Sequence, residues 1–257
     1  MQDCNVMQIL KALKFIKDYT FSKSYIYTDL DLVMAMVNDL DKKCDEKLKK
    51  KFNQNPYSKL FYKQENLKDT VFKNRYKKGT LGSELKLFWK NNSDDLFQKN
   101  YNLSQIKGKK NIIYMQGVLN EHDVIHCLNK LDSTPLAEVS VLAFTLGKEF
   151  RWSFFLILLS SFFISFKNSF GKNKIQGNFF FKIKYTPVVS VFRIIKEGYK
   201  NGRKTKWFLT VDWHSYLRTP IDEVRKELNI QEFPVWEDIK PKWYELLTHY
   251  KRIDTRI

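Results

Sequence analysis

The sequence is poor in the residues that build disulfide-linked or finger-type metal proteins. Its 257 residues include three cysteines, Cys4, Cys44 and Cys127, and these have no paired spacing. An odd, scattered set predicts no disulfide framework and favours a reducing compartment. Histidine is also scarce, at four residues, yet two of the four, His122 and His126, stand four positions apart.

Arginine is the second shortage. Lys and Arg total 45 against 28 Asp and Glu, which gives a formal charge of +17, but only 8 of the 45 are arginine. No Arg-rich stripe, Gly-rich aromatic box or Cys/His finger accompanies this charge, so we predict no nucleic-acid partner. The pattern is typical of a lysine-heavy coding bias spread over the whole surface. As a functional interpretation, a weak, peripheral attraction to an anionic membrane is favoured over nucleic acid.

A membrane-spanning segment is the third feature that the sequence lacks. The run Trp152–Phe166 is apolar for about 15 residues, whereas a spanning helix needs about 20. We interpret it as a buried core helix, with a lipid-facing or lipid-binding helix as the alternative. The N-terminus has no secretory pattern, and with Asp3 and Asp18 but no Arg it does not resemble a transit peptide. It predicts an amphipathic helix with one apolar face, formed by Val6, Ile9, Leu10, Leu13 and Ile16.

Helical periodicity dominates what remains. Apolar residues make up 43% of the chain and aromatic residues 16%, which suffices for a sizeable core, and the length fits one large domain, with two domains as the alternative. Strand patterns are scarce: the best candidate, Phe179–Val189, is ambiguous, and the helix that follows is expected to end near Gly198 or Gly202. We therefore predict an all-α fold, a single multi-helix globular domain over residues 1–257, in which residues 1–60 form an N-terminal helical extension.

The stretch "HDVIH", His122–His126, is the strongest candidate site. Positions i and i+4 of a helix share a face, with Cβ atoms about 5–6 Å apart, so the two imidazoles can offer nitrogen ligands to one metal. Asp123 lies three residues before His126, and its carboxylate can lean toward the same place. Polar helix faces that are simply solvated remain the alternative.

Glu138 joins this cluster only if the chain turns back. On a continuous helix, twelve residues at about 1.5 Å each would carry it about 18 Å from His126. The letters "DSTP" provide the turn, because Ser133 or Thr134 suits an N-cap and Pro135 suits the first position of a new helix. The spacing therefore predicts a His-Asp-His-Glu cluster in a metal site between two antiparallel helices.

The motif resembles the zinc motif of the family of the fourth Coq protein, which serves ubiquinone (coenzyme Q) biosynthesis. In that family His-Asp-x-x-His is followed, after eleven residues, by Glu. The segments Tyr76–Phe97, with "GTLGSELKLFW", and Glu197–Ile230 are similar to further parts of the family, so the resemblance covers residues 65–235 as a family-like core. It implies that the four zinc ligands are His122, Asp123, His126 and Glu138.

The resemblance also implies an activity. The family's proposed reaction removes the carboxyl group from ring carbon 1 of a polyprenylated hydroxybenzoate-type precursor and hydroxylates that carbon. The expected cofactor is Zn²⁺, although the nitrogen and oxygen donors leave Fe and Mn open. The alternative is a non-catalytic scaffold that binds isoprenoid or quinone lipids, organises the other quinone-biosynthesis enzymes and keeps a structural metal. A metal-dependent hydrolase is weaker, because the H-E-x-x-H protease pattern is absent.

The resemblance places such a protein peripherally on a membrane. This is the cytoplasmic face in a bacterium, or the matrix side of the inner membrane in a mitochondrion. A homodimer is a further expected assembly. The apolar stretch after the motif is predicted to wall a tunnel for an isoprenoid tail, with core packing as the alternative; the proposed lining residues are Phe154, Phe155, Leu158 and Phe162.

Three remaining candidates are assigned to packing or solvent rather than to chemistry. His214 is expected on the surface or packed, with a supporting role at the metal as the alternative, and His249 is expected in solvent. Cys127 follows His126 directly and therefore points about 100° away from it on a helix, which favours packing over ligation. No catalytic residue is assigned beyond the metal ligands themselves.

Overall fold

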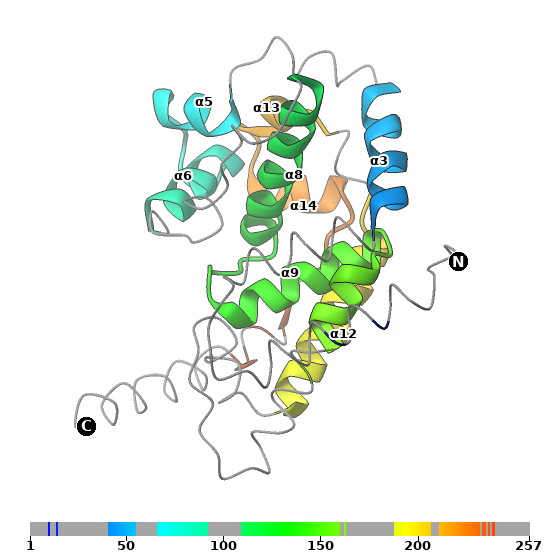
Figure 1. Ribbon diagram of the computed structural model, residues 1–257. Coiled ribbons are helices and arrows are strands. Elements are labelled where there is room, and N and C mark those ends of the chain that lie inside the picture. The colour runs from blue at the N-terminus through cyan, green and yellow to red at the C-terminus, as the bar shows by residue number, and fades with distance from the viewer. Residues whose placement is uncertain are drawn as a thin grey trace, which may run out of the picture. The chain divides into compact units, whose positions relative to one another are not determined.

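The computed structural model describes five long stretches of the chain: residues 41–54, 66–91, 109–159, 188–206 and 211–231. It also describes Leu10, Lys14, Phe162 and five residues between 233 and 239. The regular elements in these stretches are helices, and no strand occurs among them (Figure 1). This confirms the predicted all-α class. The ambiguous strand at 179–189 and most of the predicted N-terminal helix lie outside the described residues.

The chain divides into two compact units. One consists of residues 43–133 and 204–232 and is called here the α6–α8 unit. The other consists of residues 1–42, 134–203 and 233–257 and is called the α9–α12 unit. Each unit therefore combines segments that are far apart in sequence. The prediction of a single domain over residues 1–257 stays a prediction.

The α6–α8 unit is a helical cluster in which α6 contacts α5, α8 and α14. Its core is formed by Leu85 of α6, Ile125 of α8 and Val224 of α14, each at most 1% exposed. The helices of this unit are α3 (Lys42–Gln54), α5 (Leu67–Lys73), α6 (Leu81–Asn91), α8 (Lys109–Leu128), α13 (Trp213–Tyr216) and α14 (Ile221–Glu227).

The start of α6 is fixed by backbone bonds to a distant part of the sequence. Leu81 donates its N–H to the carbonyl of Thr219 at 3.0 Å, and Ile221 donates to the carbonyl of Gly79 at 2.9 Å. Gly79 has φ of +84°, a left-handed conformation that glycine adopts without the steric cost a Cβ brings. These bonds hold the first turn of α6, the helix that contacts α8.

The α9–α12 unit contains α9 (Pro135–Lys148), a helical stretch at residues 152–159 and α12 (Val188–Lys204). Its buried apolar side chains include Phe144, Leu156 and Ile194. Helix α12 continues through Gly198 and Gly202 and ends at Lys204, two residues beyond Gly202 and close to the predicted end.

Both glycines also lie at a close crossing of two helices. A Cβ added to Gly202 would lie 1.9 Å from the carbonyl oxygen of Phe144, and one added to Gly198 would lie 2.8 Å from that of Ser140. Such distances leave no room for a side chain, so glycine allows α9 and α12 to approach backbone to backbone.

The apolar stretch that starts at Trp152 lies partly in the core. Leu156, Ile157 and Leu158 are at most 3% exposed, whereas Phe155 is 37% exposed. No helix in the described part of the chain is long and apolar enough to cross a membrane.

Candidate metal centre

Helix α8 brings the two histidines of the motif onto one face. It begins at Lys109 and carries the motif in its second half. The spacing of four residues places the rings of His122 and His126 with their centroids 4.8 Å apart. His126 is fully buried, and the side chain of His122 is 18% exposed.

The turn predicted from "DSTP" is present. Helix α8 ends at Leu128, and Lys130 has a left-handed φ of 55°, which reverses the backbone just beyond the helix. Thr134 is the N-cap of α9 and Pro135 occupies its first turn. Glu138 consequently lies in the first turn of α9 and is 4% exposed.

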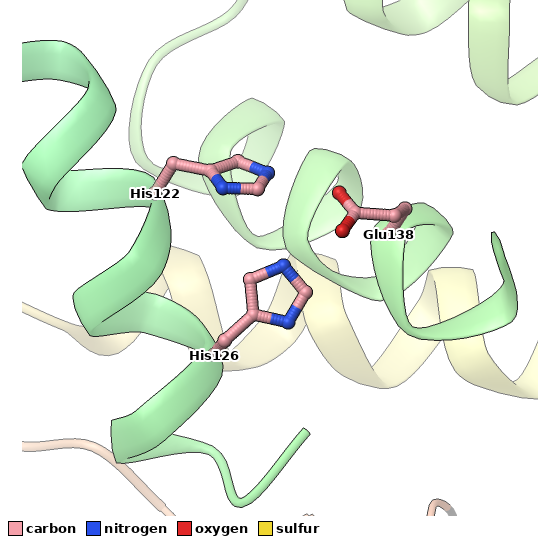
Figure 2. Close-up of side chains that lie close together, drawn as sticks. All are labelled: His122, His126 and Glu138. Carbon is pink, nitrogen blue, oxygen red and sulfur yellow. The ribbon is translucent and has the colours of Figure 1, made fainter. Parts of the chain in front are cut away.

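Three of the four predicted ligands come together. His122, His126 and Glu138 each offer one ligand atom, and these atoms all lie within 4.8 Å of one another. Figure 2 shows the carboxylate of Glu138 directed toward the two imidazole rings. Two imidazole nitrogens and one carboxylate oxygen are a donor set that suits zinc, and also iron or manganese. The cluster is therefore a possible metal-binding triad.

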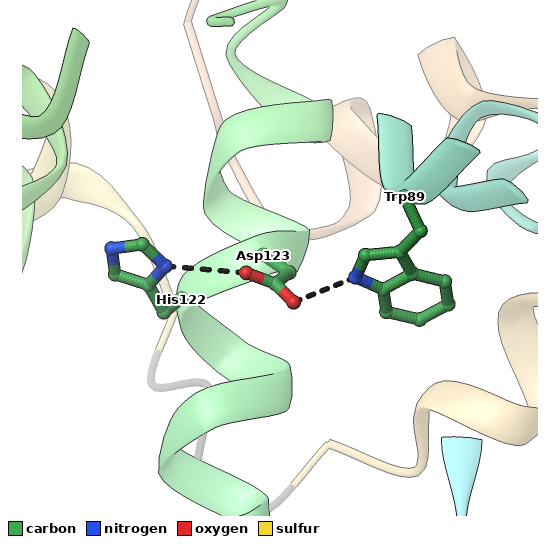
Figure 3. A network of polar contacts seen from close by, with 3 residues as sticks. All are labelled: Trp89, His122 and Asp123. Carbon is green, nitrogen blue, oxygen red and sulfur yellow. Dashed lines mark hydrogen bonds and ion pairs between the residues drawn. The ribbon is translucent and has the colours of Figure 1, made fainter. Parts of the chain in front are cut away.

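Asp123, the fourth predicted ligand, is not part of this triad. Its Oδ2 accepts a hydrogen bond from Nε1–H of Trp89 at 2.7 Å. Its Oδ1 lies 3.3 Å from Nδ1 of His122. Figure 3 shows Asp123 between the imidazole on one side and the indole on the other. Whether Asp123 also binds a metal stays a prediction.

Two consecutive aromatic residues of α6 contact the motif, and sequence reasoning did not identify either. Phe88 stacks on the ring of His126, with centroids 5.1 Å apart and planes inclined by 29°. Trp89, 4% exposed, donates the hydrogen bond to Asp123. The segment carrying them was singled out for its resemblance to the family, but nothing in its spacing indicates that "FW" faces the histidines.

Two other candidates from the sequence, Cys127 and His214, are described by the structure and are not members of the triad. Cys127 is 7% exposed, and burial raises the pKa of its thiol well above the ordinary value, with the charges of Asp123 and Glu84 adding to the shift. Because a thiolate is the metal-binding form, Cys127 is a packed thiol. His214, on α13, donates its backbone N–H to the carboxylate of Asp212 at 3.2 Å. His249 lies outside the described residues.

The four proposed lipid-lining residues differ in exposure. Leu158 is 3% exposed and Phe155 is 37% exposed, while Phe154 and Phe162 are half-buried. Phe162 packs against Phe192 of α12, with ring centroids 6.4 Å apart. Their role as a lining for an isoprenoid tail stays a prediction.

Comparison with known proteins points to one pathway. The family model described as coenzyme Q (ubiquinone) biosynthesis protein Coq4 matches residues 31–234, a range that begins before the predicted core at 65. A solved structure from Nostoc punctiforme, of a protein assigned to ubiquinone biosynthesis, covers 86% of this chain and 95% of its own at a TM-score of 0.53. At 17% sequence identity, this structural likeness shows a shared fold. No curated protein sequence matches this chain.

Proposed function

Because this chain belongs to the Coq4 family of coenzyme Q (ubiquinone) biosynthesis proteins, we propose that it acts in that pathway as a zinc-dependent protein. Its substrate is a polyprenylated hydroxybenzoate-type precursor, and the reaction removes the carboxyl group from ring carbon 1 and hydroxylates that carbon. Replacing a carboxyl by a hydroxyl group is an oxidation, so dioxygen or another oxidant takes part. The cluster of His122, His126 and Glu138 carries the proposal.

The donor set of two histidines and one glutamate suits a catalytic metal. Catalytic zinc sites commonly use three protein ligands and keep a fourth position for water or substrate, and two histidines with one glutamate are one such set. Structural zinc sites, in contrast, are closed by four protein ligands. A triad of His122, His126 and Glu138 therefore supports a catalytic role over a structural one.

The residues of the site have separate tasks in the proposed reaction. A bound divalent cation would polarise a carboxylate or phenolate oxygen of the substrate and stabilise charge that builds on the ring as carbon dioxide leaves. His122 and His126 would hold the cation through neutral nitrogens, while Glu138 would contribute the negative charge. Phe88, stacked on His126 at 5.1 Å, holds that ring in place and excludes water from its face.

Metal analysis tests this function directly. Protein purified without chelator is expected to contain about one zinc, iron or manganese ion per chain. His122→Ala should lose the metal and the turnover of the precursor. His214→Ala is the matched control, because the backbone N–H that bonds Asp212 survives the change. Folded wild-type protein without any divalent metal, or equal turnover by both variants, would refute the proposal.

The second candidate function, a lipid-binding scaffold for the quinone-biosynthesis enzymes, is supported by exposed aromatic side chains. Phe150 and Phe155 are 46% and 37% exposed. Both rings lie near the ring of Trp152, at centroid distances of 5.1 and 6.0 Å. An aromatic cluster of this kind suits the edge of a lipid bilayer or an isoprenoid chain. Native mass spectrometry that finds no isoprenoid or quinone bound to purified protein would count against this role.

A further inference from the structure

Both carboxylate oxygens of Asp123 have partners inside the α6–α8 unit. Trp89 Nε1–H donates to Oδ2 at 2.7 Å, and His122 Nδ1 lies 3.3 Å from Oδ1 (Figure 3). The bond from Trp89 is buried and joins residues 34 positions apart in the sequence. The side chain of Asp123 is 6% exposed, so little water competes for these contacts.

The chemistry of the three groups fixes where the protons are. An indole N–H only donates, and an ionised carboxylate only accepts. With the Asp123 carboxylate ionised, the 3.3 Å contact is a hydrogen bond only when Nδ1 of His122 carries the proton. In the neutral imidazole the lone pair then resides on Nε2, which is the nitrogen that remains for the triad with His126 and Glu138.

We propose that Asp123 and Trp89 are positioning residues: Asp123 acts on the metal through His122, and Trp89 acts through Asp123. This inference rests on the proposed metal-dependent function. It replaces a fourth ligand by a relay of two hydrogen bonds, which connect Trp89 of α6 through Asp123 to Nδ1 of His122 and leave Nε2 to face the metal. Residues 122 and 123 point about 100° apart around α8, which is why one side chain joins the triad while its neighbour bonds Trp89.

Such a relay has a characteristic effect on metal affinity. A carboxylate that accepts from a ligating histidine fixes its tautomer and orientation, and its loss costs about 10- to 100-fold in affinity. Loss of Trp89 should cost less, because Asp123 keeps its contact with His122. The ligand set itself stays unchanged in both cases.

Cobalt(II) binding to purified, metal-free protein provides the first test, because its visible spectrum reports the ligands. Asp123→Ala is expected to weaken binding about 10- to 100-fold and, at saturating cobalt, to show the wild-type spectrum. In the double variant Trp89→Phe/Asp123→Ala, the loss of Trp89 should add nothing further. An altered cobalt spectrum in Asp123→Ala would identify Asp123 as a direct ligand. If the loss of cobalt affinity from Trp89→Phe added to the loss from Asp123→Ala, Trp89 would have a merely structural role. Either result overturns the inference.

The second test needs no metal and so separates this inference from the proposed function. In ¹⁵N-resolved NMR at about pH 8.5, two units above the ordinary imidazole pKa of about 6.5, His122 is expected as the Nδ1–H tautomer in wild type. It should change to Nε2–H in Asp123→Ala. Nε2–H in the wild type, or an unchanged tautomer in the variant, refutes the relay even if the protein binds metal. Wild type that shows Nδ1–H but binds no cobalt refutes the metal function instead.

Trp236→Phe is the matched control for Trp89→Phe. Trp236 is fully buried, and its Nε1–H has no acceptor among the described residues. The same substitution there should leave cobalt affinity and the His122 tautomer unchanged. Far-UV circular dichroism and thermal unfolding of each metal-free variant confirm that the fold is retained.

Discussion

At the scale of the residue, one buried carboxylate in the α9–α12 unit holds the start of a helix. Asp41 is fully buried and accepts from the backbone N–H groups of Trp152 at 2.8 Å and Ser153 at 3.1 Å, and from the Ser153 hydroxyl. These N–H groups belong to the first turn of the helix at 152–159, where no intrahelical carbonyl is available to them. Asp41 therefore supplies from 111 residues away what a local N-cap usually provides.

The raised pKa of Asp41 predicts that the stability of the folded protein depends on pH. Burial raises the pKa of Asp41 above 3.8 in the folded protein, against the lowering effect of its hydrogen bonds to Ser153. The native state thus binds this proton more tightly than the unfolded chain does. The resulting stability is complete below pH 3.8 and is lost as pH rises through the folded-state pKa.

Asp41→Asn has no such proton to bind. The difference in free energy of unfolding, wild type minus variant, should therefore fall as pH rises from 3.8 through the folded-state pKa, and then become constant. Urea titrations of both proteins at several pH values measure it. A difference that does not vary with pH would show that Asp41 has the same pKa in both states.

Residue types and short spacings predicted the histidine pair and the turn, but not the contacts of Asp123. His122 and His126 share a face by helical periodicity, and Thr134 with Pro135 marks a helix start in any context. Trp89 comes from another helix, and no local rule connects it with a residue 34 positions away. The 100° offset between neighbouring helix positions was the one available sign that Asp123 and His122 have different tasks.

At the scale of the element, two glycines in helices are expected to respond oppositely to alanine. Gly202→Ala puts a Cβ 1.9 Å from the Phe144 carbonyl oxygen, so α9 and α12 must separate, at a cost of about 1–3 kcal/mol or more. Gly117→Ala on α8 puts a Cβ 3.7 Å from Phe52, an ordinary contact, and should stabilise by up to about 1 kcal/mol through helix propensity. Thermal or urea unfolding distinguishes them, and equal effects would exclude a close crossing at Gly202.

The same glycines show why a helix crossing was harder to predict than a helix end. A glycine after an amphipathic run commonly ends a helix, and by itself it gives no sign of a partner helix at contact distance. Gly198 and Gly202 lie within α12, which continues to Lys204. The facing carbonyls of Ser140 and Phe144 belong to another helix, so the choice between a helix end and a crossing is made by tertiary structure.

At the scale of the whole molecule, the net charge of +17 predicts a salt-dependent attraction to anionic membranes. Each basic residue near such a surface contributes about 1 kcal/mol. This attraction weakens as the Debye length falls from about 30 Å at 0.01 M salt to about 3 Å at 1 M. Charge alone would make the binding purely electrostatic, whereas the exposed rings of Phe150 and Phe155 add apolar contact that salt does not screen.

The two contributions separate in a vesicle sedimentation experiment. Wild type should bind vesicles containing phosphatidylglycerol at 0.01 M salt, lose most of that binding toward 1 M, and bind phosphatidylcholine vesicles weakly. Phe150→Ser/Phe155→Ser keeps every charge, so it should bind more weakly at each salt concentration with the same salt dependence. Leu87→Ser, which removes a 53% exposed apolar side chain from the α6–α8 unit, is the control and should behave as wild type. Equal binding to both lipids, or binding unaffected by salt, would mean that the lysine-rich surface does not direct this protein to membranes.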